Sequence, residues 1–188
     1  MLTTNNALID DLIERTRSHL NALEQLRSLP EEVLQHKTDA DSWNALECIE
    51  HLNLYGDFYL PEIEKSLKKA NIYPAEGTFK SGWLGNYFAK SLLPKEKLNK
   101  MKTFRDKDPN GLPLDKSVLS RFLQQQKQTL DLLNRARTVN MTQVRVPTTI
   151  ARWIRINLGD IFRVVIYHNQ RHILQAQRVI AHLQKQEA

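Results

Sequence analysis

The sequence lacks any apolar run long enough to cross a bilayer. A membrane-spanning helix needs about 20 consecutive apolar residues, and no hydrophobic stretch of the 188-residue chain approaches that length. The N-terminal stretch also lacks a basic region followed by an apolar core, so we expect a cytoplasmic protein. Glycine and proline are scarce, at six and seven residues, and this composition is far from that of disordered proteins. The length fits one folded domain spanning residues 1–188.

Cysteine is nearly absent, since Cys48 is the only one. This excludes an internal disulfide framework and a cysteine-rich zinc knuckle. A metal site in this chain would therefore rely on histidine or carboxylate ligands. The net charge of +6 permits weak contact with nucleic acid. However, the lysines and arginines are scattered and accompany no zinc finger or helix-turn-helix, so we expect a small-molecule substrate and no specific nucleic-acid partner.

Apolar residues recur at intervals of three and four positions in four long segments. This spacing places them on one face of a helix. It predicts helices over residues 3–29, 44–70, 115–138 and 158–184. We expect Asp41 or Ser42 to cap the second helix, Pro61 to kink it, and Asp115 to cap the third. Four amphipathic helices of this length predict an all-α four-helix bundle.

The connections between these segments suggest the topology of the bundle. A link of 44 positions, residues 71–114, joins the second and third helices and contains one short helical stretch, "WLGNYFAKSLL". A link of this length lets the two helices run parallel, which predicts an up-down-down-up order with a long crossover. Residues 139–157 form the second long link, in which we expect "VRVPTT" to be extended.

Two histidines lie four positions apart in the last predicted helix, within "VVIYHNQRHILQAQRVI". At this spacing the His168 and His172 rings lie one above the other, about 6 Å apart, and can converge on one metal ion. An isolated pair of this kind is more often two core histidines with hydrogen bonds of their own. His51 occupies an equivalent buried position on the second helix. Because three buried imidazoles need partners for their ring nitrogens, a shared divalent metal ion is the favoured interpretation.

Two kinds of metal site are excluded by the neighbouring residues. A zinc-protease helix needs a glutamate directly after its first histidine, and that position is Asn169. A di-iron bundle needs Glu-x-x-His pairs, and none of the six histidines has one. Three histidines leave coordination positions open, as catalytic sites do. Cys48, one turn before His51, would close the site as a fourth ligand, but a small buried apolar side chain is the preferred interpretation.

Other polar residues fall near the predicted buried faces. Gln126 and Thr16 are candidate substrate contacts, although neighbouring side chains could equally satisfy Gln126. Tyr55 is a candidate catalytic proton donor, with a core aromatic that has a polar tip as the alternative. Glu47 and Asp160 could orient an imidazole, although we expect them to be solvated charges at helix ends. The remaining histidines, which lack comparable partners, are expected at the surface: His19, His36 and His182.

Two segments carry a resemblance to a known family. "DSWNALECIEHL" and "LGDIFRVVIYHNQRHILQAQRVI" resemble the second and last helices of the DinB-like superfamily (DNA-damage-inducible, YfiT-like) of metal-dependent enzymes. The resemblance extends over nearly the whole chain. It implies one divalent metal ion, nickel or zinc, held by His51, His168 and His172, and it implies a homodimer.

The resemblance also suggests reactions. Some relatives are thiol-dependent S-transferases that use bacillithiol, mycothiol or glutathione. It therefore implies a metal-dependent transferase that activates a low-molecular-weight thiol against a small electrophile. The alternatives are a metal-dependent hydrolase of small esters or amides and a bundle that binds metal or ligand without turnover. Arg171 could bind the carboxylates of a thiol cofactor or form a salt bridge instead, and the same cofactor role is open to Arg145, Arg152 and Arg155.

Overall fold

The structure is a computed structural model that describes residues 1–72, 77–94 and 103–186. The described chain is mostly helical, which confirms the all-α class. It contains six α-helices: α1 (Asn5–Arg27), α2 (Glu31–Gln35), α3 (Ala45–Lys68), α4 (Trp83–Leu92), α5 (Ser117–Arg135) and α6 (Leu158–Gln186). The four long helices and the short helix α4 all lie where the sequence predicts them.

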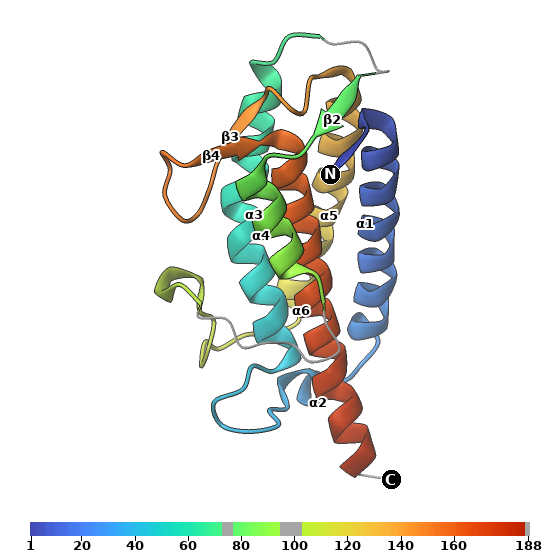
Figure 1. Ribbon diagram of the computed structural model, residues 1–188. Coiled ribbons are helices and arrows are strands. Elements are labelled where there is room, and N and C mark those ends of the chain that lie inside the picture. Colours follow the sequence, from blue (N-terminus) through green and yellow to red (C-terminus); the bar gives the residue numbers. More distant parts are fainter. Residues whose placement is uncertain (73–76, 95–102, 187–188) are drawn as a thin grey trace.

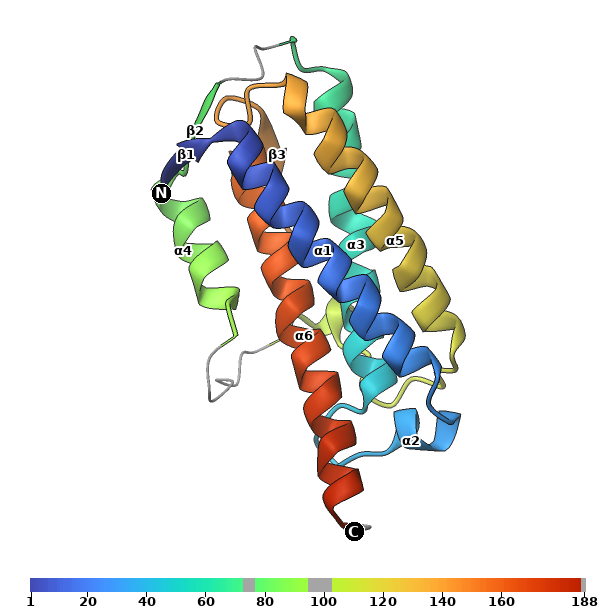
Figure 2. The ribbon, with the colours of Figure 1, turned by 90° about the vertical axis from the view of Figure 1, so that its right-hand side faces the viewer.

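The four long helices pack side by side along most of their length (Figures 1 and 2). Helix α3 contacts α5 and α6, and α1 contacts the same two helices from the other side. Helix α4 packs on the outside of α6. Residues 73–76 and 95–102 of the predicted crossover link lie outside the described residues.

The start of α3 differs from the prediction. Asn44, rather than Asp41 or Ser42, caps the helix, and its side-chain oxygen accepts a hydrogen bond from the Glu47 backbone N–H at 2.8 Å. The Glu47 carboxylate in turn accepts from the Asn44 backbone N–H at 2.9 Å, which completes a capping box. Ser42 instead donates to the Asp39 carbonyl oxygen and closes the preceding turn. Pro61 lies inside the helix, as predicted.

In the part of the chain that the structure describes, four short strands form two small antiparallel sheets. Strand β1 (Leu2–Thr4) pairs with β2 (Thr78–Lys80), so the first residues of the predicted helix are extended instead. Strands β3 (Arg145–Pro147) and β4 (Arg155–Asn157) form a hairpin. This confirms the extended segment expected around "VRVPTT". Both sheets lie beside the N-terminal end of α6 (Figure 1).

The hydrophobic core is divided into two clusters along the bundle. One includes Leu8, Ile9, Leu12 and Ile13 of α1 with Phe162 and Ile166 of α6, and the other includes Leu23 and Leu26 of α1 with Ile173, Ala176 and Ile180 of α6. Buried polar side chains occupy the layer between the clusters, among them His19, Asn53, Gln126, His168 and His172. Polar groups are costly to bury without partners, so the side chains of this layer must have binding partners within the core.

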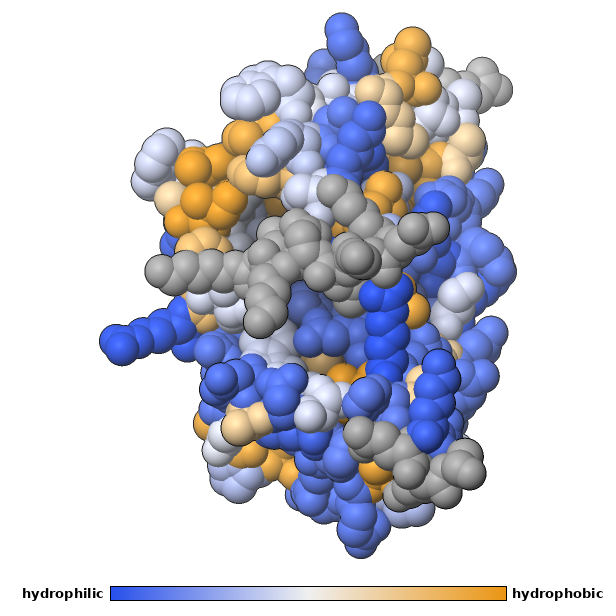
Figure 3. Space-filling view, turned by 60° about the horizontal axis from the view of Figure 1, so that its bottom comes forward, coloured by the Kyte–Doolittle hydropathy of each residue, from blue (hydrophilic) through white to orange (hydrophobic). Residues whose placement is uncertain are grey.

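The outer surface is predominantly hydrophilic. In the view of Figure 3, hydrophilic residues cover most of the face and hydrophobic ones emerge in separate patches. Within the described residues, no helix has the length and apolar character needed to cross a membrane.

Candidate metal centre

Three histidines from two helices meet in the polar layer of the core. His51 projects from α3, and His168 and His172 project from adjacent turns of α6. All three are buried, and one ring nitrogen from each lies within 4.8 Å of the other two. The Nε2 atoms of His51 and His168 are 3.2 Å apart. The structure therefore brings together the three predicted metal-ligand residues.

Hydrogen bonds fix the tautomers of two of these rings. His51 donates from Nδ1 to the Lys107 carbonyl oxygen at 2.7 Å. His172 donates from Nδ1 to the Gln175 side-chain oxygen at 2.9 Å. A neutral imidazole carries one N–H, so Nε2 of both rings is left with a lone pair. Metal-binding histidines in proteins are oriented in this way by partners on the second nitrogen.

Burial keeps the three rings uncharged. It lowers the pKa of His51 to about 4 and that of His172 to about 3. It also lowers the pKa of His168 well below its ordinary value, an effect to which His172, His51 and Arg171 add as nearby charges. At neutral pH all three imidazoles are therefore neutral, the form in which histidine binds metal ions.

This donor set fits a divalent metal ion. Three neutral imidazole nitrogens are typical ligands of zinc and nickel. Among the described residues, no other group of histidine, cysteine or acidic side chains clusters in this way. Cys48 is fully buried among apolar residues, and burial raises the pKa of its thiol. It is not one of the side chains whose ligand atoms group together.

Two aromatic side chains flank the cluster. The Trp43 ring lies 4.7 Å from the His51 ring and 5.7 Å from the His172 ring, measured between centroids. The Tyr55 ring lies 4.6 Å from that of His168 and 5.0 Å from that of His51. Tyr55, a predicted catalytic candidate, is thus placed beside the cluster. Burial raises its pKa to about 12, so its hydroxyl is protonated and able to donate a hydrogen bond.

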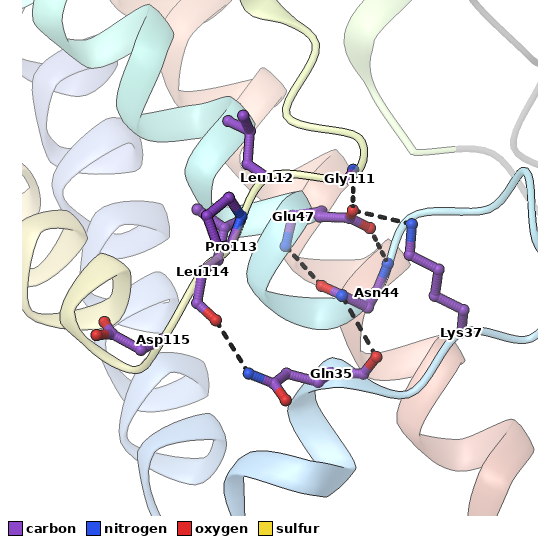
Figure 4. Close-up of a pocket in the computed structure, with 9 residues that line it drawn as sticks. All are labelled: Gln35, Lys37, Asn44, Glu47, Gly111, Leu112, Pro113, Leu114 and Asp115. Carbon is purple, nitrogen blue, oxygen red and sulfur yellow. Dashed lines mark hydrogen bonds and ion pairs between the residues drawn. The ribbon is translucent and has the colours of Figure 1, made fainter.

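The segment that supplies the Lys107 carbonyl is anchored to the start of α3. Asp108 accepts a hydrogen bond from the Trp43 indole N–H at 3.2 Å. Figure 4 shows the second anchor, in which the Glu47 carboxylate accepts from the Gly111 backbone N–H and forms an ion pair with Lys37, at 2.8 and 2.9 Å. Glu47, Lys37 and Gly111 line a cavity of about 430 Å³. The anchors hold the backbone that fixes the His51 tautomer.

Glu47 and Asp160 are buried, which corrects the expectation that they are solvated charges. Glu47 is 1% exposed and performs the capping and anchoring just described. Asp160 is 0% exposed and forms a 2.9 Å ion pair with Arg163. It also accepts from the Gly82 backbone N–H. Both carboxylates orient backbone segments rather than an imidazole.

A second polar group lies across the bundle. His19 is 3% exposed, so its predicted surface position is wrong. Its Nδ1 lies 3.4 Å from the Gln126 side-chain oxygen, which also accepts a hydrogen bond from Asn169. Thr16 is buried one turn earlier and donates to the Leu12 carbonyl oxygen. The contacts of Gln126 are thus with His19 and Asn169, whereas Tyr55 contacts the histidine cluster.

Arg171 lies on α6 between His168 and His172 in the sequence. It is 4% exposed, and burial lowers the pKa of its guanidinium. Its positive charge contributes to the lowered pKa values of His168 and His172. The other predicted cofactor-binding arginines, Arg145, Arg152 and Arg155, lie on or beside the β3–β4 hairpin.

Sequence reasoning did not assign roles to three residues of this site. Trp43 precedes the helix and Gln175 follows His172 by three positions, a spacing that places the two on one helix face. That spacing is a usable signal for Gln175. Lys107 acts through its backbone carbonyl, and no residue type signals such a role.

Comparison with known proteins identifies a family for this chain. Searches of curated proteins and of solved structures gave no match. Residues 12–176 match the DinB superfamily, and this region includes all three histidines, both flanking aromatics and most of the four long helices. The chain therefore belongs to the DinB superfamily.

Proposed function

We propose that the protein binds one divalent metal ion, nickel or zinc, through His51, His168 and His172. The observation that carries this proposal is the fixed tautomer of two rings, since Lys107 and Gln175 leave Nε2 of His51 and His172 free to coordinate. The 3.2 Å separation of the His51 and His168 Nε2 atoms supports it. The four long helices would have the up-down-down-up order, because α1 and α6 begin at one end of the bundle and α3 and α5 at the other (Figure 1).

The proposed activity is the transfer of a low-molecular-weight thiol to a small electrophile. A bound divalent ion supplies a Lewis acid that lowers the pKa of a thiol or of water. Tyr55 would donate a hydrogen bond to the electrophile, because its hydroxyl is protonated at neutral pH. Arg171 would contribute positive charge beside His168 and His172. Trp43 would exclude water from the other side of the cluster.

The metal proposal is tested by elemental analysis and titration. We expect the wild-type protein to bind about one equivalent of nickel or zinc, and His168→Ala to bind far less. His182→Ala is the matched control, because His182 is exposed near the end of α6. Circular dichroism would show that the variants are folded. Equal metal content in the wild type and in folded His168→Ala would overturn the site.

The reaction is tested separately with glutathione, bacillithiol and mycothiol against 1-chloro-2,4-dinitrobenzene. In this reaction a carbon–sulfur bond forms, chloride leaves and the thiol proton passes to solvent. We expect thiol-dependent chloride release that requires the metal ion. Hydrolysis of 4-nitrophenyl acetate without any thiol would favour the hydrolase instead. A metal-loaded protein that is inactive in both assays would favour a binding role.

A further inference from the structure

A second cavity lies between the hairpin and the start of α4, apart from the histidine cluster. Its volume is about 400 Å³, within the range of small-molecule sites. Strand β4 contacts α4 here, beside β2 (Figure 1). Its lining includes Lys80, Trp83, Arg145, Arg155, Asn157 and Asp160. Asp160 precedes His168 by eight residues on α6, which is roughly 12 Å along the helix axis.

Three cationic side chains gather at this cavity, namely Lys80, Arg145 and Arg155. All three are exposed. Within the part of the chain that the structure describes, none of them forms an ion pair with a carboxylate. The Arg155 guanidinium donates to the Arg145 carbonyl oxygen at 2.8 Å, which holds it against the hairpin. The three positive charges therefore lie at the cavity without a carboxylate that neutralises them.

The hairpin register places the two arginines on one face. Arg145 lies directly opposite Asn157, and Arg155 is two residues before Asn157 on the same strand, opposite Pro147. The two arginines are therefore diagonal neighbours on this face, about 7–8 Å apart, within reach of one anion. Asn157 donates to the Lys80 carbonyl oxygen at 3.1 Å and so ties the third cation to this face. A bound anion would relieve the repulsion among the three.

The nearest carboxylate does not offset this charge. Asp160 already accepts hydrogen bonds from Ser81 and from the Gly82 backbone N–H, and it pairs with Arg163. The start of α4 is thus already occupied by the Asp160 carboxylate. Lys80, Arg145 and Arg155 are the charges left to select a ligand, and they favour an anion.

An aromatic surface completes the cavity. Trp83, the first residue of α4, lines it and is 83% exposed. Exposed indole rings bind planar groups by stacking. We propose that this cavity binds a nucleoside phosphate, with the phosphate on Lys80, Arg145 and Arg155 and the base on Trp83. The proposal does not depend on the metal site, because no residue of the histidine cluster lines this cavity.

The test is isothermal titration calorimetry of the full chain with AMP, inorganic phosphate and adenosine. We expect AMP to bind at least tenfold more tightly than either of the other two, and 0.5 M salt to weaken its binding. The double variant Arg145→Gln/Arg155→Gln should lose AMP affinity at least tenfold, whereas the control Arg178→Gln, an exposed arginine on α6, should not. Trp83→Ala should lower AMP affinity and leave phosphate affinity unchanged, and Trp153→Ala, also 83% exposed, serves as its control.

Three results would overturn the proposal. The first is no heat of binding for AMP. The second is AMP binding that the double arginine variant retains in full. The third is AMP binding that is lost in folded His168→Ala but not in the arginine variant, which would place the nucleotide at the histidine cluster.

Discussion

His51 donates from Nδ1 to the carbonyl oxygen of Lys107, 2.7 Å away and 56 residues later in the chain. This bond makes the tautomer of a metal-ligand candidate depend on a loop that is anchored elsewhere. The anchors are the Trp43–Asp108 hydrogen bond and the contacts of Glu47 with Gly111 and Lys37. Substitutions in these anchors should therefore alter metal binding, although they replace none of the three histidines.

Glu47→Gln should weaken both the fold and metal binding. A glutamine can still complete the capping box, but it loses the ion pair with Lys37, whose side chain is 27% exposed. We expect the free energy of unfolding to fall by about 1–3 kcal/mol, measured in urea. Nickel affinity, measured by calorimetry, should fall as the Lys107 backbone loosens. Glu24→Gln, which breaks an exposed pair with Arg27, is the control. Unchanged nickel affinity in Glu47→Gln would show that the anchor does not act on His51.

Gln175→Leu should lower metal affinity with little effect on stability. The Gln175 oxygen accepts the His172 Nδ1 proton, and removing such a partner of a metal-bound histidine costs about 10- to 100-fold in affinity. Nickel titration of the wild type and the variant measures the difference. Gln177→Leu, at a half-buried position on the same helix, should bind nickel as the wild type does. Equal losses of nickel affinity in the two variants would show that Gln175 has no specific role in metal binding.

The fold was largely predictable because the apolar spacing in each long segment is regular. The start of α3 was not, because Asp41, Ser42 and Asn44 are all good caps and the choice depends on where Asp39 and Ser42 close a turn. Strand β1 was also missed. Its pairing partner, β2, lies more than 70 residues away, so local sequence carries no signal for it.

The site was predictable where helical spacing decides the position. His51, His168 and His172 lie on the buried faces of their helices, and the structure confirms that they meet. His19 follows Thr16 by three positions, so the same spacing would have placed it on the buried face of α1. The absence of a second histidine nearby led to the wrong surface position. The role of the Lys107 carbonyl could not be predicted, because every residue has a backbone carbonyl and the residue type does not indicate which one binds a histidine.

Stability of the metal-free protein should fall as the pH drops from about 6.5 towards 4. Burial lowers the pKa of His19 to about 4, whereas an unfolded histidine titrates near 6.5. Below pH 6.5 the unfolded state therefore binds more protons than the folded state, so acid favours unfolding. Between pH 7.5 and 5.0 His19 alone lowers the free energy of unfolding by about 2 kcal/mol. Urea unfolding of the wild type and His19→Gln at pH 7.5 and 5.0 measures this.

The variant should lose about 2 kcal/mol less than the wild type over this pH interval. His51 and His172 add to the slope in both proteins, because their pKa values are lowered in the same direction. His36→Gln is the control, since His36 is only half-buried on the segment after α2. Identical slopes in the wild type and His19→Gln would mean that His19 is not held neutral in the folded state.

Asp160→Asn should be the most destabilising of these substitutions. Arg163 is 3% exposed, and Asp160 supplies its counter-charge at 2.9 Å. Removing one member of a buried ion pair leaves an uncompensated charge and costs about 3–5 kcal/mol. Urea unfolding measures the loss, with Asp10→Asn as the control, because the Asp10–Arg137 pair is largely exposed and should contribute less than about 1 kcal/mol.

The double variant Asp160→Leu/Arg163→Met should recover part of the loss, since it leaves no buried charge. A double variant no more stable than Asp160→Asn would show that the hydrogen bonds of this pair to Ser81 and Gly82, rather than its charges, hold α4 against α6.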